Sequence, residues 1–181
     1  MDNLREMLIT TPSRDLRNVH KDVWRLACRN TDRVDGRTFL FALAGDGRVL
    51  VRGPHLLPAP HSRAVDPLRD GQTYRFVLDA RTIHRGSAGE NLVAQQDVPD
   101  WLAARLPGFA LLETRASMPR RRLLEANRTL PYRTIAGMVN VTDAQQAQKV
   151  LFSGVGRGKA FGFGMLVLLQ RVDTVKSADA A

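Results

Sequence analysis

Residues 154–164 read GVGRGKAFGFG and join a helix predicted over residues 143–152 to a strand predicted over residues 163–170. Five glycines alternate here with two cations and two aromatic residues, a combination that a simple turn does not require. Glycine lets a backbone approach a phosphate closely, and Arg157 and Lys159 add positive charge. This glycine-rich segment therefore predicts a phosphate-contacting loop; the alternative is a plain connection whose glycines only shape the turn. The predicted contacts are Gly154, Gly156, Arg157, Gly158 and Lys159.

Two common phosphate-binding patterns do not fit the glycine-rich segment. A Walker A loop has four residues between its first glycine and a Gly-Lys pair, and Ser or Thr follows the lysine. Here three residues separate Gly154 from Gly158 and Lys159, and Ala160 follows. A dinucleotide fingerprint follows a strand and opens a helix, whereas this segment follows a helix and opens a strand. Nucleotide binding of the P-loop and Rossmann kinds is therefore excluded.

The first half of the chain predicts one amphipathic helix among short strands. The helix has Ser13 as its N-cap, apolar residues at helical spacing and an end near Arg29. The GDG stretch at residues 45–47 predicts a hairpin turn, because Gly and Asp tolerate a positive φ. Prolines between residues 54 and 67 predict a loop instead of a second helix. The predicted strands cover residues 4–10, 38–43, 48–52 and 73–78.

The second half predicts two more helices. Asp97 caps a short helix that reaches Arg105, and a capping box of Thr142 and Gln145 begins the helix ahead of the glycine-rich segment. Further strands are predicted at residues 109–115, 132–141 and 163–170. The sequence therefore predicts an α+β fold.

This order of elements resembles two tandem ferredoxin-like (RRM-like) units with antiparallel sheets, the second lacking a clear first strand. The open face of such a sheet commonly carries single-stranded RNA. The predicted divisions are an N-terminal domain at residues 1–80 with the first helix, a linker at 81–96, a C-terminal domain at 97–171, and a disordered tail at 172–181.

Composition limits the class of protein. Among the 181 residues, 44% are hydrophobic and 25% are charged, which is typical of a globular chain and excludes a disordered or collagen-like one. Apolar runs such as Met165–Leu169 are far too short to cross a bilayer, and the N-terminus lacks a signal peptide pattern. We therefore expect a soluble, cytoplasmic protein without membrane contact. A single cysteine, Cys28, excludes an internal disulfide and a cysteine-based zinc cluster, and we expect no metal site and no cofactor.

The charge balance favours a phosphate-rich partner. The chain carries 27 basic and 18 acidic residues, a formal net charge of +9, and only four of the basic residues are lysine, which leaves 27 − 4 = 23 arginines. Arginine offers a planar, bidentate fork to phosphate. Codon usage in a GC-rich genome would also exchange Lys for Arg, but it does not explain the excess of positive charge.

Two separated motifs resemble one known family. The pattern of a helix, then Gly-x-Gly-x-Gly-Lys-x-x-Gly-x-Gly, then an apolar strand resembles the signature of CRISPR repeat endoribonucleases. Residues 13–24, SRDLRNVHKDVW, resemble the first helix of the Cascade-type (subtype I-E) member, often called CasE. The resemblance covers residues 4–53 and 108–171. In the shorter middle region, the family's Phe-x-Leu-x-x-Asn-Pro stretch corresponds to residues 76–81, FVLDAR, without Asn-Pro.

His20 is the candidate catalytic residue that the resemblance implies. At about 100° per residue, His20 lies within the apolar arc of the first helix, next to a basic face of Arg14, Arg17 and Lys21. RNA supplies its own nucleophile, the 2′-hydroxyl, so His20 as general base or acid with Arg17 or Lys21 as electrostatic stabiliser is sufficient for cleavage. The alternative is a packed, structural histidine. The family typically has a tyrosine one turn earlier, where Arg17 stands here.

A second basic cluster, Arg120, Arg121 and Arg122, is predicted in a hairpin loop that by resemblance tracks the groove of an RNA stem, with solvated charge as the alternative. His55, His61 and His84 are predicted to be surface residues. The resulting hypothesis is a metal-independent endoribonuclease that cleaves CRISPR repeat stem-loop RNA to mature crRNA with a 2′,3′-cyclic phosphate end. It stays on the 3′ handle with other subunits of a CRISPR surveillance complex. The alternative is a non-catalytic RNA-binding subunit of the same fold.

Overall fold

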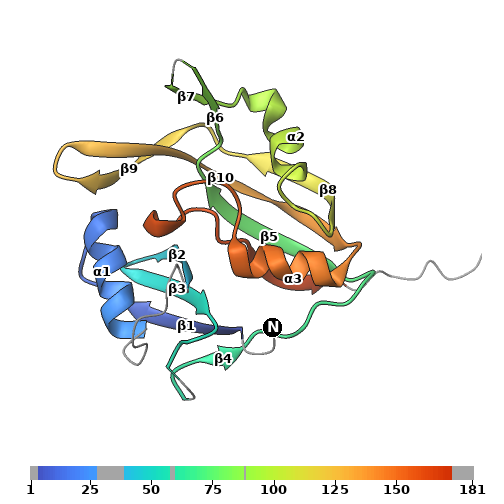
Figure 1. Cartoon of the computed structure of the whole chain (residues 1–181), viewed down its shortest axis with the longest axis horizontal. Coiled ribbons are helices and arrows are strands. Elements are labelled where there is room, and N and C mark those ends of the chain that lie inside the picture. Colours follow the sequence, from blue (N-terminus) through green and yellow to red (C-terminus); the bar gives the residue numbers. More distant parts are fainter. Residues whose placement is uncertain (1–3, 28–38, 58–59, 88, 173–181) are drawn as a thin grey trace, which may run out of the picture.

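The computed structural model describes residues 4–27, 39–57, 60–87 and 89–172. Its N-terminal part is an antiparallel sheet in the order β2-β3-β1-β4, with helix α1 on one face (Figure 1). The elements are β1 (Arg5–Thr10), α1 (Leu16–Ala27), β2 (Leu40–Gly45), β3 (Arg48–Gly53) and β4 (Arg63–Ala64).

A second antiparallel sheet has the order β11-β5-β10-β8, and helices α2 and α3 pack on one of its faces. Its elements are β5 (Thr73–Ala80), α2 (Val98–Ala103), β8 (Phe109–Ala116), β10 (Arg128–Val141), α3 (Ala144–Ser153) and β11 (Val167–Val172). Smaller elements are β6 (Ile83–Gly86), β7 (Gly89–Leu92), β9 (Arg120–Glu125) and two 3₁₀ turns, η1 (Gln95–Asp97) and η2 (Lys159–Phe161).

The two sheets repeat one strand order, which confirms the tandem ferredoxin-like prediction but changes its division. When the four strands of each order are numbered along the chain, both sheets have the order fourth, first, third, second. The strand predicted over residues 73–78 as the end of the first unit is β5, the first strand of the second unit, because it pairs with β10 and β11. The first unit ends with β4, in a stretch predicted to be a loop. Strand pairing therefore divides the chain between β4 and β5, and residues 81–96 lie within the second unit.

Local chemistry explains the first unit. The β2–β3 turn has positive φ at Gly45, Asp46 and Gly47, as predicted. On α1, the residues at helical spacing are buried: Leu16, Val19, Val23 and Ala27. The predicted N-cap is wrong, because the Asp15 carboxylate accepts the Asn18 backbone N–H at 2.9 Å, and this bond lowers the pKa of Asp15. Cys28, the predicted helix end near Arg29 and residues 173–181 of the predicted tail lie outside the described residues, whereas Val172, its predicted first residue, ends β11.

Three further boundaries differ from the predictions. Helix α3 is capped by Asp143, whose side chain accepts the Gln146 backbone N–H, so the capping pair lies one residue later than expected. The last strand begins at Val167, four residues later than predicted. In the stretch before it, the Gly164 N–H donates to the Asp79 carbonyl and the Gly164 carbonyl accepts from the Val155 N–H. Residues 120–122 lie on β9 and not in a loop, since β9 pairs with the first part of β10.

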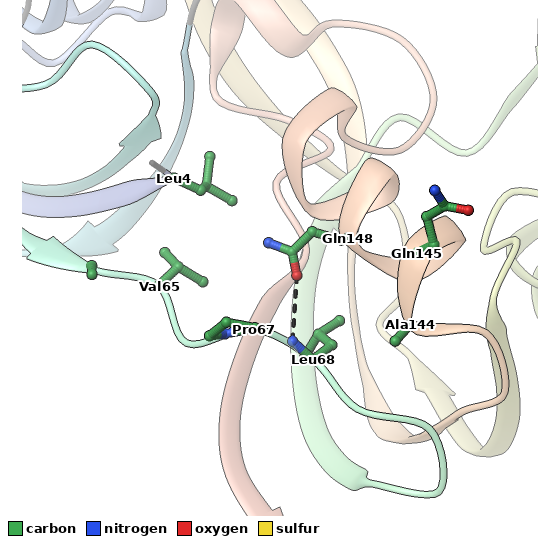
Figure 2. A pocket seen from close by; sticks show the side chains of 8 residues that line it. Leu4, Val65, Pro67, Leu68, Ala144, Gln145 and Gln148 are labelled. Atoms are coloured by element: carbon green, nitrogen blue, oxygen red, sulfur yellow. Dashed lines mark hydrogen bonds between the residues drawn. The ribbon is translucent and has the colours of Figure 1, made fainter. Parts of the chain in front are cut away.

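One of the contacts between the two units lies on the face of the first sheet opposite α1. A pocket of about 490 Å³ lies at this junction, between the segment that joins β4 to β5 and helix α3 (Figure 2). The Leu68 backbone N–H donates to the side chain of Gln148 across it at 3.5 Å. Its lining residues are all uncharged: Leu4, Ala64, Val65, Pro67, Leu68, Ala144, Gln145 and Gln148. Among the described residues, no helix is long and apolar enough to span a bilayer.

Candidate functional site

Helix α1, the β9–β10 hairpin and the glycine-rich segment meet at one place. Residues 128–132 of β10 pair with β9, whereas residues 133–141 of the same strand pair with the second sheet. The hairpin therefore extends beyond the sheet, and it reaches over α1 (Figure 1). Buried residues from all three parts form one cluster, which consists of Leu16, Leu124, Tyr132 and Phe163.

The His20 ring packs against two phenylalanine rings, Phe39 directly before β2 and Phe41 of β2, which together are called the aromatic floor. The half-buried His20 ring stacks on Phe39 with 5.7 Å between ring centroids and 29° between planes, and the Phe41 ring lies 6.3 Å away. Phe41 also contacts the glycine-rich segment, because a Cβ added to Gly162 would stand 2.7 Å from Phe41 Cε2. One aromatic ring thus joins the histidine to a segment more than 130 residues later in the sequence.

Three predicted cations lie on or just before α1, and all three are exposed. Arg14 precedes the helix, Arg17 is three residues before His20 and so is its neighbour on the helix surface, and Lys21 is the next residue after it. Arg17 makes an ion pair with Glu125 at the end of β9, so its guanidinium also joins α1 to the hairpin. Sequence reasoning missed Glu125, because no local pattern places the end of β9 beside a helix more than 100 residues earlier.

Hydrogen bonds fasten the start of α1. The Asp22 carboxylate accepts the hydroxyl protons of Thr11 and Ser13, the latter at 2.7 Å. These bonds lower the pKa of Asp22 below its ordinary value, and so Asp22 stays ionised when its partners are in place. The segment that leads to Arg14 and Arg17 is therefore held against the body of the helix.

The three consecutive arginines of β9 do not share one environment. Arg120 and Arg121 are exposed. Arg122 points inward: its Nη2 donates to Asp79 Oδ2 at 3.0 Å, and its guanidinium carbon lies 4.3 Å from the centroid of the Tyr132 ring. Strand alternation could have separated Arg122 from Arg121, because Arg122 lies on the same face as the buried Leu124. Arg120 shares that face but is exposed at the start of β9.

The glycine-rich segment uses its glycines for its own conformation. Gly154, Gly156, Gly158, Gly162 and Gly164 all have a positive φ, between 68° and 82°. At Gly158, with a φ of +81°, an added Cβ would stand 2.9 Å from Arg81 Cδ and 3.0 Å from Phe163 Cδ2. Backbone shape and close packing thus require glycine at these positions, and phosphate contact by their backbone stays a prediction.

The cations of this segment face a different neighbour. Arg157 is exposed, and its backbone forms an isolated β-bridge with Arg81, next to the β6–β7 hairpin. Arg81 in turn donates from Nη2 to Glu90 Oε2 at 2.5 Å. Lys159 is half-buried in the η2 turn, which contacts α1. The segment therefore lies beside Arg81 at Arg157, and beside α1 in the η2 turn that contains Lys159.

The remaining histidines lie apart from this arrangement. His55, His61 and His84 are exposed, as predicted. Within the described ranges, no group of three or more His, Cys, Asp or Glu side chains could hold a metal ion. The candidate site thus consists of one half-buried histidine, the cations around it and the rings beneath it.

A family model places the chain among known proteins. The model described as CRISPR associated protein matches residues 3–170. The chain belongs to this family. The family resemblance that the two sequence motifs indicated is therefore confirmed. No curated protein sequence matches the chain.

Solved structures of CRISPR proteins share the fold. The CRISPR endoribonuclease Cse3 bound to a 19 nt RNA matches with a TM-score of 0.77 and 20% identity, over 94% of this chain and 100% of that one. Thermus thermophilus Cse3, bound to an RNA representing a pre-cleavage complex, gives 0.76 and 22% identity over 94% and 100%. Cas6e from Escherichia coli str. K-12 gives 0.64 and 18% identity over 91% and 97%. The CRISPR-associated chain thus has the fold of these proteins.

Proposed function

We propose that the chain is a cytoplasmic, metal-independent endoribonuclease that cleaves CRISPR repeat stem-loop RNA. The observation that carries the proposal is the position of Phe41, whose ring contacts both His20 and the glycine-rich segment. This contact puts the His20 imidazole of the first unit and a segment of the second unit that carries two cations beside the same buried ring. Membership of the CRISPR associated family, and the fold shared with endoribonucleases bound to RNA, support RNA as the substrate.

The reaction needs one proton acceptor and one proton donor at the scissile phosphate. The 2′-oxygen of the RNA attacks phosphorus as it loses its proton, the new O2′–P bond forms, and the P–O5′ bond breaks as O5′ gains a proton. The products are a 2′,3′-cyclic phosphate and a 5′-hydroxyl. His20 serves as the general base or the general acid in this step, because imidazole is the side chain suited to accept or donate a proton at physiological pH.

Arg17 and Lys21 stabilise the negative charge that develops on the phosphate oxygens. Both are on α1 within one turn of His20, and both are exposed to an incoming strand. Arg17 makes its ion pair with Glu125 near the surface, and such pairs contribute only about 0–1 kcal/mol. A phosphate can therefore replace the carboxylate as the partner of Arg17 when RNA binds.

RNA binding extends from α1 onto the hairpin and the glycine-rich segment. We assign phosphate contacts to Arg14, Arg120, Arg121, Arg157 and Lys159, together with backbone groups of Gly154, Gly156 and Gly158. Arg122 instead holds the hairpin in place, because its charge already pairs with Asp79. A CRISPR RNA-guided surveillance complex contains a chain of this fold, and retention of the 3′ handle with other subunits of such a complex is part of the proposal.

The test is incubation of the purified protein with end-labelled repeat hairpin RNA in excess EDTA. We expect a single cut and a 3′ product end that resists ligation until its cyclic phosphate is opened and the resulting phosphate is removed. Tight binding without a cut would instead support the non-catalytic RNA-binding subunit. Cleavage that occurs only after a divalent metal is restored would contradict the metal-independent mechanism.

A further inference from the structure

One buried arginine of the first unit donates hydrogen bonds to both ends of the connection between α3 and β11, which contains the glycine-rich segment. Arg52 of β3 is only 3% exposed. Its Nη1 donates to the carbonyl of Leu166 at 2.8 Å and, more weakly, to the carbonyl of Leu151 at 3.4 Å. Leu151 lies in the last turn of α3 and Leu166 directly precedes β11, so the two carbonyls flank residues 152–165.

Glu6 of β1 supplies the opposite charge. It stands directly across from Arg52 in the β1–β3 register, and its Oε1 accepts from Arg52 Nε at 3.0 Å and Nη2 at 2.7 Å. Arg63 donates to the other carboxylate oxygen at 2.8 Å from an exposed position. Burial acts to raise the pKa of Glu6, but the charge and hydrogen bonds of Arg52 and Arg63 outweigh it and lower that pKa.

Arg52 lies on the same pair of strands as Phe41, one of the two rings of the aromatic floor beneath His20. Val51, the neighbour of Arg52 on β3, pairs with Phe41 on β2. The side chains of adjacent strand residues point to opposite faces, so Phe41 faces α1 while Arg52 faces the second unit. The same pair of strands therefore supports His20 on one face and holds the ends of the glycine-rich connection on the other.

We infer that Arg52, neutralised by Glu6, is a positioning residue that holds the glycine-rich segment in register with His20. The inference rests on the proposed endoribonuclease function. Arg52 is buried and does not contact RNA, so its loss leaves the number of phosphate contacts unchanged. Loss of Arg52 instead shifts the bound phosphate away from His20. A misplacement of the reacting groups by about 1 Å can lower a rate about 100-fold.

The test uses paired variants, because Arg52→Met alone leaves a buried carboxylate with too few partners. Arg52→Met combined with Glu6→Gln removes the hydrogen bonds to the connection and the buried charges together. Arg52→Lys keeps the charge but not the planar fork that reaches two carbonyls and a carboxylate. Arg63→Met is the matched control, because it removes a partner of Glu6 that makes no contact with the connection.

Three quantities are measured for each folded variant: the single-turnover cleavage rate constant, the dissociation constant for hairpin RNA, and backbone hydrogen exchange without RNA. For the double variant we expect cleavage about 10- to 100-fold slower and binding within about threefold. We also expect the double variant to accelerate exchange at residues 154–164, relative to the wild type, about tenfold more than it does in the rest of the chain. Arg52→Lys should be intermediate, and Arg63→Met should resemble the wild type.

Equal cleavage rates in the wild type and the double variant would overturn the inference and leave the proposed function intact. Exchange that accelerates uniformly along the chain would also overturn it, since the pair would then contribute only general stability. A wild-type protein that does not cleave would overturn the proposed function itself. Local exchange would still report in that case whether Arg52 holds the connection, so the two failures are distinguishable.

Discussion

Arg122 should contribute to stability and not to RNA affinity, although its two neighbours are exposed arginines. Arg122→Ala removes a charge-assisted hydrogen bond to Asp79, which contributes about 1.5–3 kcal/mol, and a cation–π contact with Tyr132 of about 0.5–2 kcal/mol. Asp79 keeps its bond from Thr134 at 2.7 Å, so we expect a net loss of about 2–4 kcal/mol. For a chain of this size that lowers Tm by roughly 5–15 °C.

The assay compares Arg122→Ala with Arg121→Ala in thermal unfolding and in salt titrations of hairpin RNA binding. Arg121→Ala should change stability by less than about 0.5 kcal/mol, because Arg121 is exposed. It should also reduce the slope of log K against log salt by about 0.7–0.9, the value of one phosphate contact. Arg122→Ala, measured below its Tm, should keep the wild-type slope. An Arg122→Ala variant with an unchanged Tm and a reduced slope would refute this reasoning.

Three other predictions concern the glycine-rich segment and the ion pair at the junction. Replacing Arg157 and Lys159 together with Ala should reduce the salt slope by about 1.4–1.8 in the same titration. Gly162→Ala should lower Tm more than Gly45→Ala, because both have a positive φ but only the first Cβ meets a phenylalanine ring; equal losses would contradict this. The lowered pKa of Glu6 means that its stabilisation is full above pH 4.5 and is lost as pH falls through the lower, folded-state pKa. Urea unfolding of Glu6→Gln should therefore show a weaker decline in stability below pH 4.5 than the wild type.

The sequence predicted the elements better than it predicted their partners. Tyr74, Phe76 and Leu78 alternate as a strand does, and this pattern is the same whichever sheet the strand joins. The prediction placed the strand in the first unit because it follows that unit along the chain. The true fourth strand, β4, has only two residues and lies beyond a proline-rich stretch, so its pairing with β1 leaves almost no local signal.

Only part of the candidate site could be predicted, because its other contacts join residues far apart in the sequence. Helical spacing placed His20 beside Arg17 and Lys21, and this local arrangement is present on α1. Glu125 and Arg52 act through contacts with residues more than 90 positions away, and no spacing rule reaches that far. The glycines were predicted to contact phosphate, which stays a prediction. Their positive φ values also give them a conformational role, which the sequence offered only as the alternative.

The measurement that tests the central claim most directly is single-turnover cleavage of repeat hairpin RNA in EDTA by His20→Ala, with His84→Ala as the control. His84 is an exposed histidine away from α1, so the control should cut like the wild type. We expect His20→Ala to lose at least about 100-fold in rate, the contribution of general acid–base catalysis, with RNA affinity within about threefold. Cleavage by His20→Ala at the wild-type rate, with the same cyclic-phosphate product, would contradict the assignment of His20 as the proton-transfer group.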